Sequence, residues 1–86
     1  MLKLLKFGAT WCASCKTLNK VIQGMDISPV EVFEEVDIDS NVELTKQYSI
    51  KSVPTLILVK DNVEVSRMTG AAGPARVRQF IDSASV

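Results

Sequence analysis

The sequence predicts an α/β fold in which helices cover both faces of a four-stranded mixed sheet. Two apolar runs of strand length, Leu2–Phe7 and Leu56–Val59, have the nearly continuous hydrophobicity of strands buried on both faces. Segments with apolar residues at helical spacing follow the first run and close the chain. The initial β-α-β pattern implies a parallel pair with a right-handed crossover, and a later hairpin adds two antiparallel strands. The predicted order is β-α-β-α-β-β-α.

The first half of the chain supplies a strand, a helix and an acidic strand. Lys6 interrupts the strand Leu2–Phe7, where its stem can lie along the sheet while the ammonium reaches water. A helix is expected from about Cys12 to Gly24, with Gly24 as its C-cap. Its buried face is predicted from helical spacing to contain Cys15, Leu18, Val21, Ile22 and Met25. After a loop over residues 26–29, a strand is expected at Val30–Ile38, with its Asp and Glu side chains solvated.

The second half supplies a short helix, a hairpin and a closing helix. Ser40 and Glu43 have the spacing of a capping box, which predicts a helix from about Asn41 to Tyr48. Pro54 precedes the apolar run at a position where a strand tolerates proline. A turn at residues 60–62 leads to a strand over residues 63–69. The last helix is expected to begin at Pro74 and to bury the apolar residues Val77, Phe80, Ile81 and Ala84.

Length and charge limit the functional classes. A chain of 86 residues is expected to form one domain, residues 1–86. Ten basic and ten acidic residues give no net charge, which argues against electrostatic binding to nucleic acid or to a membrane surface. No apolar run approaches membrane-spanning length, and the start lacks the long apolar stretch and cleavage site of a signal peptide. We therefore expect a cytoplasmic protein, and by default a monomer.

The segment Trp11-Cys12-Ala13-Ser14-Cys15 holds the only two cysteines and the only tryptophan. Cysteines three residues apart in the first turn of a helix can close a disulfide, and the positive end of the helix favours thiolate over thiol. Cys12, nearer the helix end, is expected to attack a disulfide of another molecule, and Cys15 to resolve the mixed disulfide. A zinc site would need further ligands from carboxylates or a dimer, because the chain has no histidine and no third cysteine. A structural staple of four residues would remove little chain entropy.

Four segments resemble the thioredoxin family, in the order and spacing of that family. They are Ala9–Lys16 after the first strand, Val36–Asp39 at the end of the second, Ser52–Thr55 before the third, and Gly70 after the fourth. The resemblance implies a thioredoxin-like sheet of order 2-1-3-4 that lacks the first strand and first helix of the family. It also implies a disulfide reductase without a bound cofactor, recharged by thioredoxin reductase and acting on protein disulfides such as that of ribonucleotide reductase.

The resemblance also implies roles for residues around the cysteines. Pro54 would be a cis-proline facing the pair, and Val53 would offer backbone hydrogen bonds to an extended substrate segment. Trp11 and Gly70 would complete an apolar groove around Cys12.

This chain departs from the family pattern at several positions. Ala13-Ser14 replaces the usual Gly-Pro, Gly8 replaces a common tryptophan, and Lys20 stands at the position of a helix proline. The buried Asp of many thioredoxins and its neighbouring Lys align with Lys6 and Glu35, so this pair is inverted in charge. We hypothesise that Lys6 and Glu35 form a partly buried pair behind Cys15. Lys6 would then favour the thiolate, and Glu35 would accept the proton from Cys15.

Other functions remain possible at this stage. A glutaredoxin-like enzyme would use glutathione and would need basic groups for its carboxylates, for which Lys16 and Arg67 are weak candidates. A non-enzymatic subunit of a larger assembly would use the fold without the thiols. A disulfide oxidase or isomerase fits poorly with a chain that lacks a secretion signal.

Overall fold

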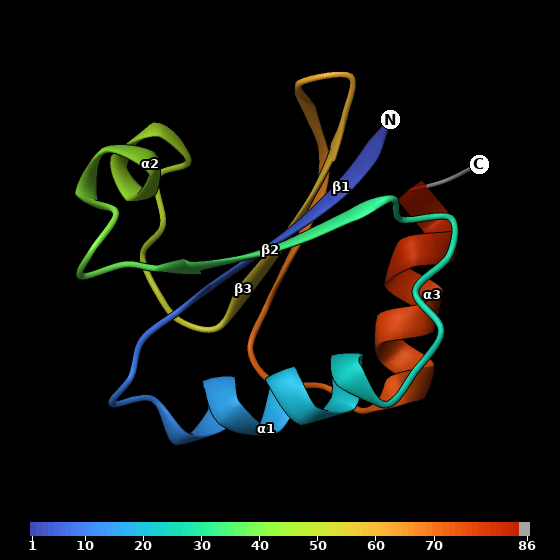
Figure 1. Cartoon of the computed structure of the whole chain (residues 1–86), viewed down its shortest axis with the longest axis horizontal. Helices are drawn as coiled ribbons and strands as arrows, with labels where there is room; N and C mark the ends of the chain where they lie inside the picture. The colour runs from blue at the N-terminus through green and yellow to red at the C-terminus, as the bar shows by residue number, and fades with distance from the viewer. Residues whose placement is uncertain (85–86) are drawn as a thin grey trace.

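The computed structural model describes residues 1–84 and has the predicted order of elements (Figure 1). The first half contains β1 (Leu2–Gly8), α1 (Ala13–Gln23) and β2 (Val32–Asp37). The second half contains α2 (Val42–Gln47), β3 (Thr55–Lys60), β4 (Val63–Thr69) and α3 (Pro74–Ala84). The predicted domain ended at residue 86, so its last two residues lie outside the described part. None of the helices in residues 1–84 has the length and apolarity that crossing a membrane requires.

The strands form one sheet in the order β2-β1-β3-β4, which confirms the predicted topology. β2 runs parallel to β1, whereas β3 is antiparallel to both β1 and β4. In this register Lys6 of β1 lies between Glu35 of β2 and Leu56 of β3. The parallel pair brings the C-terminal ends of β1 and β2 to the same edge of the sheet, where α1 begins.

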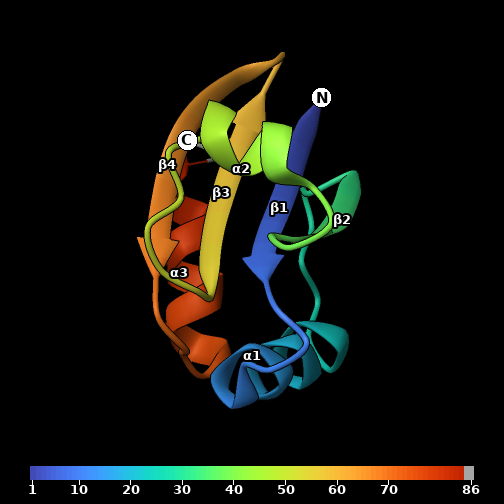
Figure 2. The same cartoon turned by 90° about the vertical axis from the view of Figure 1, so that its left-hand side faces the viewer.

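Helices cover both faces of the sheet, because alternate side chains of β1 and β3 point to opposite sides. In Figure 2, α2 lies on one side of the sheet, while α3 lies on the other. The core under α1 and α3 contains Leu2, Leu4, Leu18, Ile22, Leu56, Leu58, Met68, Val77 and Ile81. The core under α2 contains Leu5, Phe7, Val36, Ile57 and Val59, with Leu44 and Tyr48 packed against it. The two central strands are therefore buried on both faces, as their continuous hydrophobicity predicts.

The start of α2 differs from the sequence prediction. Asn41 is the N-cap residue and its side chain makes no capping hydrogen bond, so the capping box of Ser40 and Glu43 is wrong. The backbone N–H groups of Ser40 and Asn41 both donate to the carbonyl of Asp37, and the Asn41 amide donates to the same carbonyl. This turn at the end of β2 fixes where the helix begins. β2 is also shorter than the expected strand Val30–Ile38.

One arginine joins the loop after α1 to the last helix. The guanidinium of Arg78 donates to the backbone carbonyls of Asp26 and Ser28, and it also pairs with Asp82 of α3. The loop is further ordered by Asp26, whose carboxylate accepts hydrogen bonds from the backbone and hydroxyl of Ser28. These bonds lower the pKa of Asp26 below its ordinary value. Arg78 thus satisfies two carbonyls that no secondary structure would satisfy.

We expect Arg78→Met to lower the free energy of unfolding by about 1–2 kcal/mol, because two loop carbonyls lose a charged donor. Arg76→Met is the matched control, since Arg76 lies on the same helix with an exposed side chain. Chemical denaturation of both variants measures the difference. Equal stability of the two variants would show that the loop does not depend on Arg78.

Candidate active site

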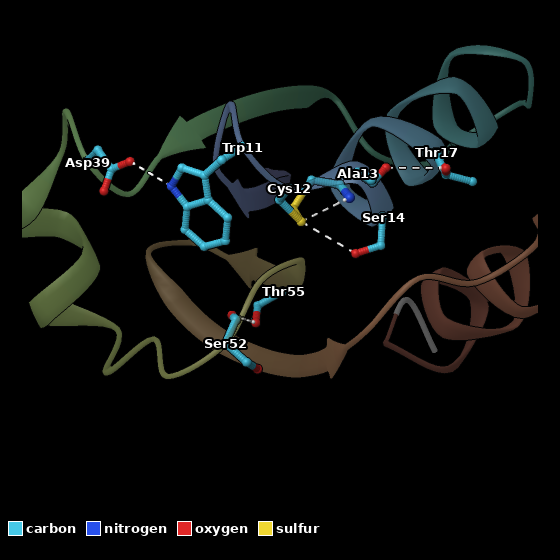
Figure 3. Close-up of a disulfide and its surroundings, with 9 residues drawn as sticks. Trp11, Cys12, Ala13, Ser14, Thr17, Asp39, Ser52 and Thr55 are labelled. Carbon is cyan, nitrogen blue, oxygen red and sulfur yellow. Dashed lines mark hydrogen bonds between the residues drawn. A yellow bond between two sulfur atoms is a disulfide. The ribbon is translucent and has the colours of Figure 1, made fainter.

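The two cysteines lie where β1 leads into α1, and they form a disulfide (Figure 3). Cys12 is the N-cap residue of α1 and Cys15 lies in its first turn, with 5.3 Å between their Cα atoms. This separation is within the usual range for disulfides. Cys12 is 7% exposed and Cys15 is 2% exposed, so the cysteine at the helix end is the more accessible of the two. The helix begins at Ala13, one residue later than expected.

Within residues 1–84, the sulfur atom of Cys12 receives hydrogen bonds from the protein, whereas that of Cys15 receives none. Cys12 Sγ accepts the backbone N–H of Cys15 at 3.2 Å, and the Ser14 hydroxyl lies 3.4 Å away. A disulfide sulfur carries no hydrogen, so the Ser14 hydroxyl is the donor. The first turn of α1 contains no acidic residue that would oppose negative charge there. In the reduced protein these donors and the helix dipole favour a thiolate at Cys12.

Trp11 presents an exposed aromatic surface beside the disulfide. The side chain is 68% exposed, and its Nε1 donates to the carboxylate of Asp39 at 3.0 Å (Figure 3). Together with Ile38, Ile50 and Val53, Trp11 lines a pocket of about 150 Å³. Asp39 therefore fixes the orientation of the indole, a role that the sequence analysis did not assign.

The segment before β3 has the predicted conformation. The Val53–Pro54 peptide is cis, and Pro54 is fully buried. The carbonyl of Pro54 accepts the backbone N–H of Gly70 at 2.9 Å, which ties this segment to the end of β4. Gly70 has a φ of +87°, a conformation that favours glycine. The structure thus brings Pro54 and Gly70 together, and places Val53 in the same pocket as Trp11.

A second pocket, of about 290 Å³, lies behind the disulfide, between α1 and the ends of β1 and β2. Both Lys6 and Glu35 line this pocket, together with Cys15. Lys6 is 5% exposed. A Cβ added to Gly8 would lie 3.3 Å from Lys6 Nζ and 3.3 Å from Cys15 Sγ. The ammonium and the sulfur are therefore neighbours across the open face of Gly8.

The expected ion pair between Lys6 and Glu35 is not formed. The ion pairs among residues 1–84 do not include these two side chains, and Glu35 is exposed. Glu35 lies on an edge strand, where its carboxylate reaches water, whereas Lys6 lies on an interior strand and turns toward Gly8. Only the lysine is buried, although both residues share the pocket.

Lys16 and Arg67, the weak candidates for binding the carboxylates of glutathione, have different surroundings. Lys16 lines the pocket behind Cys15. The Arg67 guanidinium is held by Glu64, at 2.6 Å from Nε, and by the carbonyl of Tyr48, so this group is already bound. That ion pair raises the pKa of Arg67 and lowers the pKa of Glu64. No group of three or more Cys, Asp or Glu residues within residues 1–84 is placed to hold a metal ion.

We expect Ser14→Ala to make the reduction potential of the disulfide about 10–20 mV more negative. The hydroxyl binds a thiolate more strongly than a disulfide sulfur, so its loss destabilises the reduced state. Equilibration with glutathione buffers measures the potential. Thr17→Ala is the control, because that hydroxyl bonds to the carbonyl of Ala13 on the same helix. Equal potentials for both variants would contradict a role for Ser14.

Comparisons with known proteins agree with the geometry of the site. The family described as Thioredoxin matches residues 1–83. A thioredoxin from Chlamydia trachomatis is 44% identical over 70 residues, which cover 80% of this chain and 69% of that protein. One from Mycolicibacterium smegmatis is 32% identical, over 94% of this chain and 76% of its own. The solved thioredoxin of Fasciola hepatica has a TM-score of 0.85 and 30% identity, covering 96% of this chain and 80% of its own.

The fold, the cysteine pair at the start of α1 and these similarities agree. Thioredoxins reduce protein disulfides through a redox-active cysteine pair, need no bound cofactor, and are generally reduced by thioredoxin reductase. The chain belongs to the thioredoxin family and is a thiol–disulfide oxidoreductase that acts through Cys12 and Cys15.

Proposed function

We propose that Cys12 is the attacking thiol and Cys15 the resolving thiol. The Cys12 thiolate attacks a protein disulfide, forms a mixed disulfide and releases the first substrate sulfur as a thiolate. The Cys15 thiolate then attacks Cys12, closes the disulfide and releases the second substrate sulfur, so that two electrons pass to the substrate. The observation that carries this assignment is the hydrogen bond from the Cys15 N–H to Cys12 Sγ at the start of α1.

We propose that the substrate lies across the pocket of Trp11 and the segment before β3. Val53 would pair through its backbone with an extended substrate segment, as in strand addition. Trp11 supports this role because it is a large exposed aromatic side chain that lies outside both cores. Pro54 and Gly70, joined by their hydrogen bond, would shape the opposite wall. The absence of a side chain at Gly70 leaves room for a substrate backbone to approach.

We propose that Lys6 and Glu35 assist the resolving step. The Lys6 ammonium beside Cys15 would favour the thiolate of that residue over its thiol. Glu35, which lines the same pocket, would accept the Cys15 proton through water in the mixed-disulfide state. The exposure of Glu35 supports this role, because an exposed carboxylate passes the proton on to bulk water.

We further propose a cellular setting. Residues 1–86 would act as one monomeric domain in the cytoplasm, where reducing conditions keep catalytic cysteines cycling. Thioredoxin reductase would supply electrons, and ribonucleotide reductase and other protein disulfides would consume them. Nucleic acid and membranes are not expected as partners of a chain with no net charge.

The experiment that tests the cysteine roles compares Cys15→Ser with Cys12→Ser. After mixing with an oxidised protein substrate, Cys15→Ser is expected to accumulate a covalent complex, because Cys12 attacks and nothing resolves it. Cys12→Ser should form no such complex. Electrophoresis without reductant and mass spectrometry of the bands measure both. A complex formed only by Cys12→Ser would reverse the assignment.

Glu35→Gln is expected to slow resolution of the mixed disulfide roughly tenfold, because the amide cannot accept the proton. Single-turnover oxidation of the pre-reduced protein by a protein disulfide measures this step. Glu34→Gln is the control, since it removes the neighbouring carboxylate of the same edge strand, which pairs with Lys3 instead. Equal rates for Glu35→Gln and the unmodified protein would remove the proposed role.

A further inference from the structure

The pocket behind the disulfide is lined by Cys15 and by charged side chains, and it lies on the side opposite the proposed substrate. Its volume of about 290 Å³ suits a molecule of amino-acid size and excludes a folded protein segment. Gly8 keeps it open, since even a Cβ there would crowd both Lys6 Nζ and Cys15 Sγ at 3.3 Å. Cys15, which is 2% exposed, therefore meets the substrate side through Cys12 and lines this pocket on its other side.

Polar groups of both signs surround the pocket. Within residues 1–84, Lys6 is 5% exposed and its ammonium has no hydrogen-bond or ion-pair partner in the protein. The Oδ1 atom of Asn19 is buried and accepts no hydrogen bond. Lys16 lies on the helix side of the pocket, and Glu35 lies on the strand side. Such a set complements a small molecule that carries both a carboxylate and an ammonium group.

We propose that this pocket admits a low-molecular-weight thiol with an amino-acid headgroup, which reduces the disulfide by attacking Cys15. Lys6 would hold the incoming thiolate beside the Cys15 sulfur. Lys16 would pair with the carboxylate, while Asn19 Oδ1 and Glu35 would accept hydrogen bonds from the ammonium. The proposal rests on the redox cycle of Cys12 and Cys15 and adds an electron donor to it.

The chemistry balances with two equivalents of thiol. The first thiolate forms a bond to Cys15 Sγ, the Cys12–Cys15 bond breaks, and Cys12 leaves as a thiolate. A second thiolate attacks the sulfur of the bound small molecule, forms the small-molecule disulfide and releases the Cys15 thiolate. Two electrons pass to the protein, and the small thiol is oxidised.

Attack at Cys15 has the better leaving group. The thiolate that leaves is Cys12, which receives the Cys15 N–H and the Ser14 hydroxyl and lies at the positive end of α1. A more stable leaving thiolate departs faster in thiol–disulfide exchange. Attack from the front at Cys12 would instead expel Cys15, whose Sγ receives no hydrogen bond within residues 1–84, although the cations Lys6 and Lys16 line the pocket beside it.

The first test measures whether Cys15 reacts through the pocket. In reduced Cys12→Ser protein, Cys15 is the only thiol, and we expect cystine to modify it at a rate within about tenfold of Cys12 in the Cys15→Ser protein. Adding Gly8→Leu to Cys12→Ser should fill the pocket and slow modification at least roughly tenfold. Mass spectrometry follows the adduct. If the leucine variant does not fold, Gly8→Ala replaces it. The added Cβ crowds Lys6 Nζ and Cys15 Sγ and should also slow the modification of Cys15.

The second test measures recognition of the headgroup. The oxidised protein is reduced by cysteine or by cysteamine, which lacks the carboxylate, and rates are compared per thiolate. We expect cysteine to be preferred about threefold, and Lys16→Met to remove this preference. Lys20→Met is the matched control, because Lys20 lies on the same helix outside the pocket. An inert Cys15, a rate independent of Gly8, or an unchanged preference in Lys16→Met would each overturn the proposal.

A failure of the small-thiol proposal can be distinguished from a failure of the proposed cysteine roles. Pre-reduced protein needs no electron donor, so a single turnover with a protein disulfide tests only the front of the site. Normal turnover together with an inert Cys15 would reject the small-thiol pocket and retain the cysteine roles proposed above.

Discussion

The hydrogen bond from the Cys15 N–H to Cys12 Sγ is the interaction on which the site depends. A helix leaves its first N–H groups without partners inside the helix, and here a sulfur atom takes the place of the usual capping oxygen. The position that starts α1 and the position that carries the reactive sulfur are therefore the same. β1 and its turn deliver Cys12 to this point, and the Cys12 N–H donates back to the carbonyl of Ala9. Local structure and chemistry are fixed by one residue.

The disulfide separates two environments of opposite character. On the side of Trp11, a mainly apolar pocket is lined by that indole, Val53 and two isoleucines, together with Lys51 and Ser52, and Asp39 holds the indole in place. Behind, Lys6 and Glu35 line a charged pocket. The front suits the apolar and backbone groups of an extended protein segment, because desolvation of such groups costs little when they pair. The back suits ions and water, so proton transfer and small charged molecules belong on that side.

Features with a regular period were predictable from the sequence, and features made by single side chains were not. The strands β1 and β3 and the buried face of α1 follow from hydrophobic spacing, which reports burial directly. The cysteine pair was found because its spacing itself defines the chemistry. The bonds from Trp11 to Asp39 and from Arg78 to two loop carbonyls join residues 28 to 52 positions apart, and no local pattern signals them. The capping box failed because the turn at Asp37 determined the start of α2. The Lys6–Glu35 pair failed because register places two side chains side by side but does not fix where their charged ends lie, and here Glu35 reaches water from the edge strand while Lys6 turns toward Gly8.

Gly8 and Lys6 are best understood as one linked departure from the thioredoxin pattern. Burying an ammonium without a partner costs several kcal/mol in a dry interior, and Lys6 has no ion-pair partner among the described residues. The open face of Gly8 reduces this cost, because it leaves a pocket of about 290 Å³ through which water reaches the ammonium. A tryptophan at position 8, common in the family, would fill that space and desolvate the charge. A lysine at position 6 therefore requires a small residue at position 8, and the space that keeps the lysine hydrated is also the space that exposes the rear of Cys15 to small molecules.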